Sequence, residues 1–164
     1  MVTPALKKVF ADEGIGLIGL DKGGELLVRE IAAAASLVKM SDEDLELLRP
    51  ETGAATVAHE LLANGCTRLV VVTRGAHGAM AFTAETSVEV EAPPTDLVDT
   101  VGAGDSFMAA LIAVLLEWET PRELDADRLR TLLEASVQAA AITCSRRGAN
   151  PPTRQELPPG WPGH

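Results

Sequence analysis

Aromatic residues are scarce in this sequence of 164 residues, which contains three Phe, two Trp and no Tyr. Hydrophobic residues nevertheless make up 46% of it, a share typical of a globular protein and not of a disordered one. The length is sufficient for one domain with its own core. Because aromatic side chains are so few, that core has to be built from Ala, Val, Leu and Ile.

Basic residues are also few, since 14 Lys and Arg stand against 24 Asp and Glu, for a net charge of −10. This balance argues against nucleic acid or an anionic membrane as a partner. A phosphate group bound by this protein must therefore be held by local backbone dipoles and a metal ion, not by a general positive field.

The sequence has only two cysteines, Cys66 and Cys144, and they lack the C-x-x-C spacing. This argues against a disulfide framework or a zinc site and favours a reducing compartment. No apolar run reaches 18 residues, and no basic, apolar leader opens the sequence. We therefore expect a cytoplasmic protein.

A glycine-rich stretch at residues 99–107, D-T-V-G-A-G-D-S-F, is the centre of the chain. An apolar segment before it ends at Leu97 and Val98, and an uninterrupted run follows at residues 103–118. The pattern predicts a strand, a tight turn and a long helix. Five apolar residues at helical spacing should form the inner face of that helix: Phe107, Leu111, Val114, Leu115 and Trp118.

The predicted turn has the features of an anion site. Gly102 and Gly104 let a backbone approach a ligand closely, and the unpaired amides at a helix N-terminus attract anions. Asp105 would lie beside that anion. Because like charges repel, its carboxylate suits a base acting on a nucleophile that attacks phosphorus. The simpler alternative is a glycine turn in which Asp105 only favours a helix N-terminus.

The stretch D-T-V-G-A-G-D-S-F closely resembles the C-terminal signature of the ribokinase/PfkB family of sugar kinases. The resemblance implies that Asp105 is the catalytic base and that Gly102, Ala103 and Gly104 form an anion hole for the transferring phosphoryl group. It covers residues 32–157, which correspond to the nucleotide-binding half of the family. The sugar-binding half has no counterpart, so we expect a truncated chain, a fragment or one part of a split protein.

Two further segments resemble nucleotide motifs of this family. A predicted strand at residues 37–40 precedes a helix that begins at Ser41, and Ser41 with Asp44 has the form of a capping box. The family usually has N-x-x-E there, so the resemblance implies that Ser41 and Asp44 organise water around Mg²⁺. A buried strand at residues 68–73 ends in T-R-G-A-H-G, similar to the family's T-x-G-x-x-G. This likeness implies contacts to ATP by Thr73, Arg74, Gly75 and Gly78, and the alternative is a plain glycine turn.

A last long helix is predicted by the spacing of Leu129, Leu132, Leu133, Val137 and Ala140. In the family this helix and the loop after it flank the adenine, which places Val137 against the base. The same loop and the Asp that opens the central motif often hold a monovalent cation, K⁺, and Asp99 is the matching residue.

The expected organisation has three parts. Residues 1–31 are a poorly assigned N-terminal segment, with a glycine-rich linker at 14–19 and the start of a helix that is expected from Asp21 to Ser36. Residues 32–150 form the nucleotide-binding and catalytic half of a sugar-kinase domain. Residues 151–164, which hold five of the ten prolines, form an extended tail with no role in the core.

Alternating helices and buried strands predict an α/β fold with a largely parallel sheet. The resemblance makes it ribokinase-like, a partial doubly wound sheet flanked by helices. It also implies ATP- and Mg²⁺-dependent phosphorylation of a small sugar, and V-K-M-S-D-E-D-L at residues 38–45 is most similar to fructokinases. The alternative is a nucleotide-binding remnant without activity, or half of a split kinase. A homo-oligomer or a partner chain would then supply the missing half.

Overall fold

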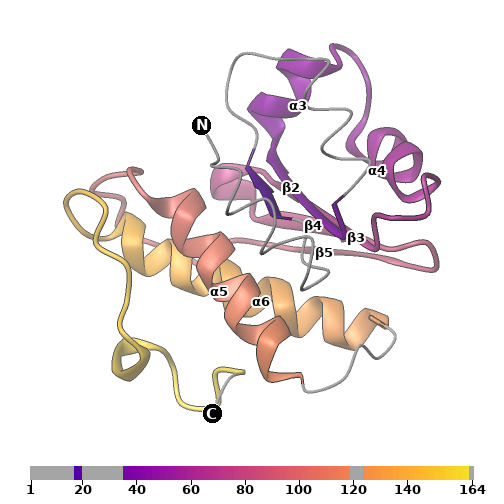
Figure 1. Ribbon diagram of the computed structural model, residues 1–164. Coiled ribbons are helices and arrows are strands. Elements are labelled where there is room, and N and C mark those ends of the chain that lie inside the picture. The colour runs from indigo at the N-terminus through magenta and orange to yellow at the C-terminus, as the bar shows by residue number, and fades with distance from the viewer. Residues whose placement is uncertain (1–16, 20–34, 119–123, 163–164) are drawn as a thin grey trace, which may run out of the picture. The chain divides into compact units, whose positions relative to one another are not determined.

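The computed structural model in Figure 1 describes residues 17–19, 35–118 and 124–162. It divides into two compact units. The first comprises the described residues of Met1–Thr73 together with Ala81–Thr86, and the second comprises those of Arg74–Met80 and Ser87–His164. The predicted helix from Asp21 to Ser36 falls almost wholly outside the described residues.

The first unit contains three parallel strands: β1 (Leu17–Gly19), β2 (Leu37–Ser41) and β3 (Leu69–Thr73). The backbone of Leu37 is in register with Leu17 on one side and Leu69 on the other. Strand β3 is buried along four of its five residues, as a continuous apolar run predicts. The linker predicted at 14–19 is wrong at its end, because the backbone of Leu17–Gly19 pairs with β2, a contact that local sequence does not encode.

Two helices connect β2 to β3. Helix α3 (Asp42–Leu48) starts directly after β2, and α4 (Ala54–Leu62) follows it. Helix α4 packs on β3 through its buried face, which includes Val57 and Ala58. The Arg49 guanidinium holds the two helical segments together by pairing with Glu60 at 2.7 Å.

A short 3₁₀ turn, η1 (Gly75–His77), leads from β3 to β4 (Ala79–Phe82) and β5 (Ser87–Val90). A tight turn between β4 and β5 is closed by the amide of Thr83, which donates to the carbonyl of Thr86 at 2.8 Å. Within the first unit, β1, β2 and β3 follow one another in the sheet in chain order.

The second unit is built on α5 (Ala103–Glu117) and α6 (Ala126–Cys144), which lie side by side in Figure 1. Buried apolar residues form the facing sides: Phe107, Leu111 and Val114 on α5, and Leu129, Leu132 and Leu133 on α6. Both helices were predicted from their apolar periodicity and are confirmed, but two residues of the predicted inner face, Leu115 and Trp118, are only half-buried because they lie in and after the last turn of α5. Helix α6 also packs on β5.

The strand predicted to end at Leu97 and Val98 is wrong. Residues 91–100 contain no strand, and the side chains of Leu97 and Val98 are 68% and 53% exposed. The amide of Val98 instead donates to the carbonyl of Cys144 at 2.9 Å, at the end of α6. Two prolines, Pro93 and Pro94, lack the amide that a strand ladder requires, which explains why the apolar pattern misleads here.

The C-terminal segment also departs from the prediction. Trp161 is only 8% exposed, and its indole Nε1 donates to the carbonyl of Ala135 on α6 at 3.2 Å. A second short turn, η2 (Arg154–Glu156), precedes it. Trp161 therefore belongs to the core of the second unit, and its large aromatic ring anchors residues 151–162, which are otherwise mostly exposed.

Candidate functional site

The glycine turn lies at the N-terminus of α5, as predicted. Gly102 is the residue before the helix, and its φ of 79° places it in the left-handed region that glycine adopts without strain. A Cβ atom at Gly102 would lie 2.8 Å from the Cβ of Ala149 and 3.0 Å from its Cα. Both the dihedral angle and the close approach of the backbone therefore require glycine here.

The start of α5 is open to an anion. No side chain among the described residues caps this end of the helix. The amide of Ala103 donates to the carbonyl of Thr100 at 3.2 Å, and that of Ser106 donates to Gly102 at 2.9 Å. Gly104 lies between them in the exposed first turn. An uncapped, solvent-facing helix start presents amide donors and the positive end of the dipole to a phosphate group.

Asp105 lies in this first turn and is exposed. Among the described residues its carboxylate has no hydrogen bond and no ion pair. Both oxygens are thus available to accept a proton from a bound hydroxyl group, which a general base requires.

Unlike Asp105, Asp99 has both of its carboxylate oxygens in hydrogen bonds to backbone amides. One carboxylate oxygen accepts from the amide of Val101 at 3.1 Å, and the other accepts from the amide of Gly148 at 2.8 Å. These backbone donors, Val101 first, lower the pKa of Asp99. The carboxylate therefore stays ionised and joins the turn before α5 to the loop after α6. Its remaining lone pairs, and the carbonyls of that loop, are suitable ligands for a monovalent cation.

Sequence reasoning missed a buried hydroxyl pair directly beside Asp105. The Oγ of Ser106, 5% exposed, lies 2.7 Å from the Oγ1 of Thr143, which is fully buried. Thr143 Oγ1 also lies 3.1 Å from the carbonyl of Ala139, so Thr143 donates to this carbonyl and accepts from Ser106. The pair holds the first turn of α5 against α6. A serine within an apolar helical face was the only available signal, and its partner is 37 positions away in the sequence.

The T-R-G-x-x-G loop is divided between the two units. In the second unit, Arg74 pairs with Glu89 and donates to the carbonyl of His77 at 3.0 Å. A Cβ at Gly78 would lie 2.0 Å from the carbonyl oxygen of Val90, and its φ of 86° lies in the left-handed region, so the local fold requires glycine there. Gly75 has a φ of 52° and is exposed.

Three other candidates lie in the first unit. Ser41 and Thr73 are register partners at the carboxyl ends of the parallel strands β2 and β3. Thr73 Oγ1 donates to the carbonyl of Met40 at 3.4 Å. Ser41 Oγ accepts from the amide of Asp44 at 3.0 Å, and one carboxylate oxygen of Asp44 accepts from the amide of Ser41 at 3.0 Å. The predicted capping box is therefore confirmed, and the second oxygen of Asp44 is left for another partner.

Val137 is on α6 in the second unit and is 7% exposed. Within that unit the loop after α6 brings Asp99 and Gly102 together, since Gly148 contacts Asp99 and Ala149 contacts Gly102.

Among the described residues no helix is long and apolar enough to cross a membrane.

Comparison with known proteins gives one consistent family. The model of the pfkB family of carbohydrate kinases matches residues 15–156. A fructokinase from Rhizobium leguminosarum bv. trifolii is 40% identical over 88 residues, which are 54% of this chain and 27% of that protein.

Two solved structures are similar in fold. Aminoimidazole riboside kinase from Salmonella enterica, complexed with aminoimidazole riboside and an ATP analogue, has a TM-score of 0.66 and 27% identity. The match covers 86% of this chain and 47% of that one. Ribokinase from Thermotoga maritima has a TM-score of 0.67 at 22% identity, over 84% of this chain and 44% of the other, and shows the ribokinase-like fold alone. This chain spans less than half the length of each of these three relatives.

Proposed function

This chain belongs to the pfkB family of carbohydrate kinases, and from that premise we propose that it carries the nucleotide-binding half of an ATP-dependent sugar kinase. One observation carries the proposal: an uncapped, exposed helix start lies directly beside a carboxylate that has no partner among the described residues. The first feature suits a phosphate group, and the second suits a hydroxyl group that has to lose its proton.

In the proposed reaction Asp105 accepts the proton of a sugar hydroxyl as its oxygen attacks the γ-phosphorus of ATP. The bond between the γ-phosphorus and the β–γ bridging oxygen breaks, and ADP leaves. The backbone of Gly102, Ala103 and Gly104 faces the equatorial oxygens of the phosphoryl group, whose charge the helix start stabilises. Five further residues are proposed to bind the nucleotide: Thr73, Arg74, Gly75, Gly78 and Val137.

The residues present fit the ions that the family implies. When bound, Mg²⁺ would neutralise charge on the β- and γ-phosphates. Ser41 and the free oxygen of Asp44 would hold its water shell, since hard cations prefer oxygen ligands. Asp99, held ionised by two amides, would contribute to a K⁺ site together with carbonyls near Arg146 and Gly148. The acceptor sugar is proposed to be fructose or a similar small sugar, given the fructokinase relative.

A second candidate follows from length, because this chain spans less than half of each of its relatives. It binds nucleotide without turning over sugar unless a second chain or a second copy supplies the acceptor site. Positioning the acceptor can contribute roughly 7–11 kcal/mol to lowering the barrier. Sugar-dependent ADP release, measured together with light scattering, separates the candidates. Brisk turnover by a monomer supports a chain that phosphorylates sugar by itself, and nucleotide binding without turnover supports the second candidate.

Nucleotide binding is the first test. We expect the wild-type chain to bind a non-hydrolysable ATP analogue with Mg²⁺ in calorimetric titration. Gly104→Val should weaken binding because a branched side chain blocks close approach to the amides. Gly53→Val is the matched control: Gly53 precedes α4 and a Cβ there meets nothing within 4 Å. Equal affinity of both variants would contradict an anion site at α5.

Asp105→Asn tests the base in any preparation that shows sugar-dependent turnover. We expect the rate to fall by about 10²–10⁴ while nucleotide affinity stays within about threefold, because the step lost is proton transfer. Asp127→Asn is the control, since Asp127 is also an exposed acid in the first turn of a helix in the same unit. If both variants lose the same activity, Asp105 acts only on the helix dipole.

A further inference from the structure

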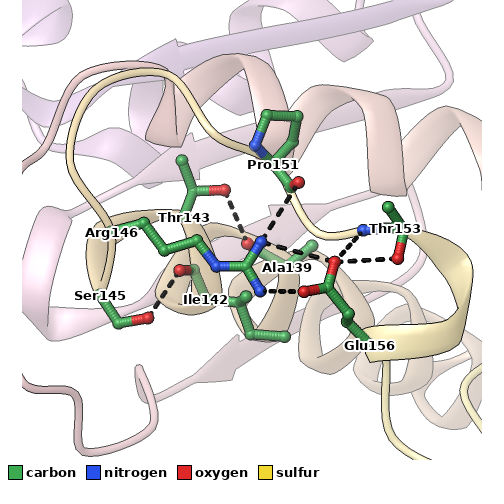
Figure 2. A network of polar contacts seen from close by, with 8 residues as sticks. All are labelled: Ala139, Ile142, Thr143, Ser145, Arg146, Pro151, Thr153 and Glu156. Carbon is green, nitrogen blue, oxygen red and sulfur yellow. Dashed lines mark hydrogen bonds and ion pairs between the residues drawn. The ribbon is translucent and has the colours of Figure 1, made fainter.

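A charged cluster outside the proposed site lies at the end of α6. Figure 2 shows the Arg146 guanidinium directed at the Glu156 carboxylate, with 2.6 Å between Nη2 and Oε1. The other carboxylate oxygen accepts from both the amide and the hydroxyl of Thr153, each at 2.8 Å. We call Arg146, Thr153 and Glu156 the C-terminal clamp.

The clamp closes a short loop. Residues 147–152 run from Arg146 to Thr153, and both ends of this segment are bound to the one carboxylate of Glu156. Arg146 Nη1 also lies 3.5 Å from the carbonyl of Pro151 within the loop. The loop ends are therefore fixed at a distance set by one side chain, which lowers the number of conformations open to the residues between them.

The residues of this loop are the ones that touch the glycine turn. The amide of Gly148 donates to Asp99, and Asp99 accepts from Val101 on the other oxygen. Ala149 contacts the backbone of Gly102, where no Cβ could fit. The amide of Asn150 donates to the carbonyl of Gly148 at 2.8 Å and keeps the loop tight. A continuous set of contacts thus leads from Glu156 to the start of α5.

We propose that Arg146, Thr153 and Glu156 are positioning residues for nucleotide binding. They hold the loop at residues 147–150 against the turn that precedes α5, and so keep the amides at the start of that helix in place for phosphate. None of the three touches the nucleotide in this role. The inference rests on the proposed function for its effect on binding, and on the structure alone for its effect on the loop.

The clamp acts on local order more than on global stability. Arg146 and Glu156 are 24% and 43% exposed, and an ion pair at such sites contributes little to the free energy of unfolding. Loss of this ion pair releases the surface loop at residues 147–152. Opening the loop costs far less free energy than unfolding the unit. This difference allows a positioning role to be told apart from a merely structural one.

Glu156→Gln is the test variant, and Glu117→Gln is its matched control. Glu117 pairs with Arg154 at 3.1 Å, so both substitutions neutralise an exposed glutamate that pairs with an arginine, and both pairs involve the segment at residues 154–156. Only the first pair closes the loop at residues 147–152. Both variants are prepared in the whole 164-residue chain.

The first measurement is amide hydrogen exchange at Gly148 and Val101. We expect Glu156→Gln to speed exchange at both amides by about tenfold or more, as local opening becomes easier, and Glu117→Gln to leave both unchanged. Equal exchange in the wild type and Glu156→Gln would overturn the proposal, whether or not the chain binds nucleotide.

The second measurement is the affinity for a non-hydrolysable ATP analogue with Mg²⁺. Because Glu156→Gln removes the charged acceptor of the clamp's hydrogen bonds, it should weaken this affinity about three- to tenfold. Glu117→Gln should leave the affinity unchanged. Thr153→Val should share the loss, and Thr153→Ser, which keeps the hydroxyl donor, should restore affinity. Faster exchange with unchanged affinity would overturn the positioning role. A wild-type chain that binds no nucleotide contradicts the proposed function, and the exchange measurement still decides the role of the clamp.

Discussion

A substitution of Gly102 by alanine tests whether the turn before α5 depends on close contact with the loop after α6. The added methyl group would meet the Cβ of Ala149 at 2.8 Å and its Cα at 3.0 Å. The backbone at this position also has a φ of 79°, which an L side chain tolerates poorly.

Two costs combine in Gly102→Ala. Holding a non-glycine residue in the left-handed region costs about 1–2 kcal/mol. Forcing extra volume into a packed contact costs about 1–3 kcal/mol more, because Ala149 has to move and its loop with it. We therefore expect the free energy of unfolding of the second unit to fall by about 2–5 kcal/mol.

Two other glycines separate these costs. Gly148 and Gly160 have φ values of 66° and 82°, and a Cβ at either meets nothing within 4 Å. Gly148→Ala and Gly160→Ala should each cost only the conformational part, about 1–2 kcal/mol. Both tryptophans, Trp118 and Trp161, lie in the second unit, so their fluorescence during urea unfolding reports on that unit.

The result that refutes this reasoning is a loss in Gly102→Ala equal to that in the two control variants. Equal losses would mean that the loop at residues 147–150 yields to the methyl group without cost. The packing between this loop and the glycine turn would then be too loose to position the turn, which would also weaken the argument for the C-terminal clamp.

Three further predictions concern the second unit. Trp161→Ala should lower its free energy of unfolding in urea by about 3 kcal/mol or more, because a buried ring and an indole hydrogen bond to Ala135 are lost; an unchanged midpoint would mean that residues 151–162 carry no packing. Thr143→Val should cost about 1–3 kcal/mol by leaving the buried hydroxyl of Ser106 without its partner, whereas Thr143→Ser should cost less. The pKa of Glu156 is lowered from 4.5 to about 2, by the amide of Thr153 first and then by Arg146; its ionised form thus stabilises the closed C-terminal clamp above pH 4.5, and this local contribution is lost as pH falls towards 2. Titration of the Glu156 carboxyl group followed by NMR should therefore give a midpoint near 2, and a midpoint near 4.5 would contradict the lowered pKa.

Local patterns in the sequence determined most of the regular elements. The apolar spacing of α5 and α6, the continuous apolar run of β3 and the capping box of Ser41 and Asp44 each act over a few residues, so they could be found without the fold. The glycine turn and Asp105 were recognisable for the same reason, since all their features lie within residues 99–107.

Contacts between distant residues were decided only by the tertiary structure. Leu17–Gly19 is a strand because β2 pairs with it. Leu97 and Val98 are not in a strand, because the carbonyl of Cys144 at the end of α6 accepts from the amides of Val98 and Asp99. Trp161 is buried because α6 offers a surface and a carbonyl acceptor 26 positions away. The partners of Asp99 and Ser106, at separations of 49 and 37 residues, follow from the packing of α5 on α6. Burial and hydrogen bonding depend on which surfaces meet, and no local pattern specifies that.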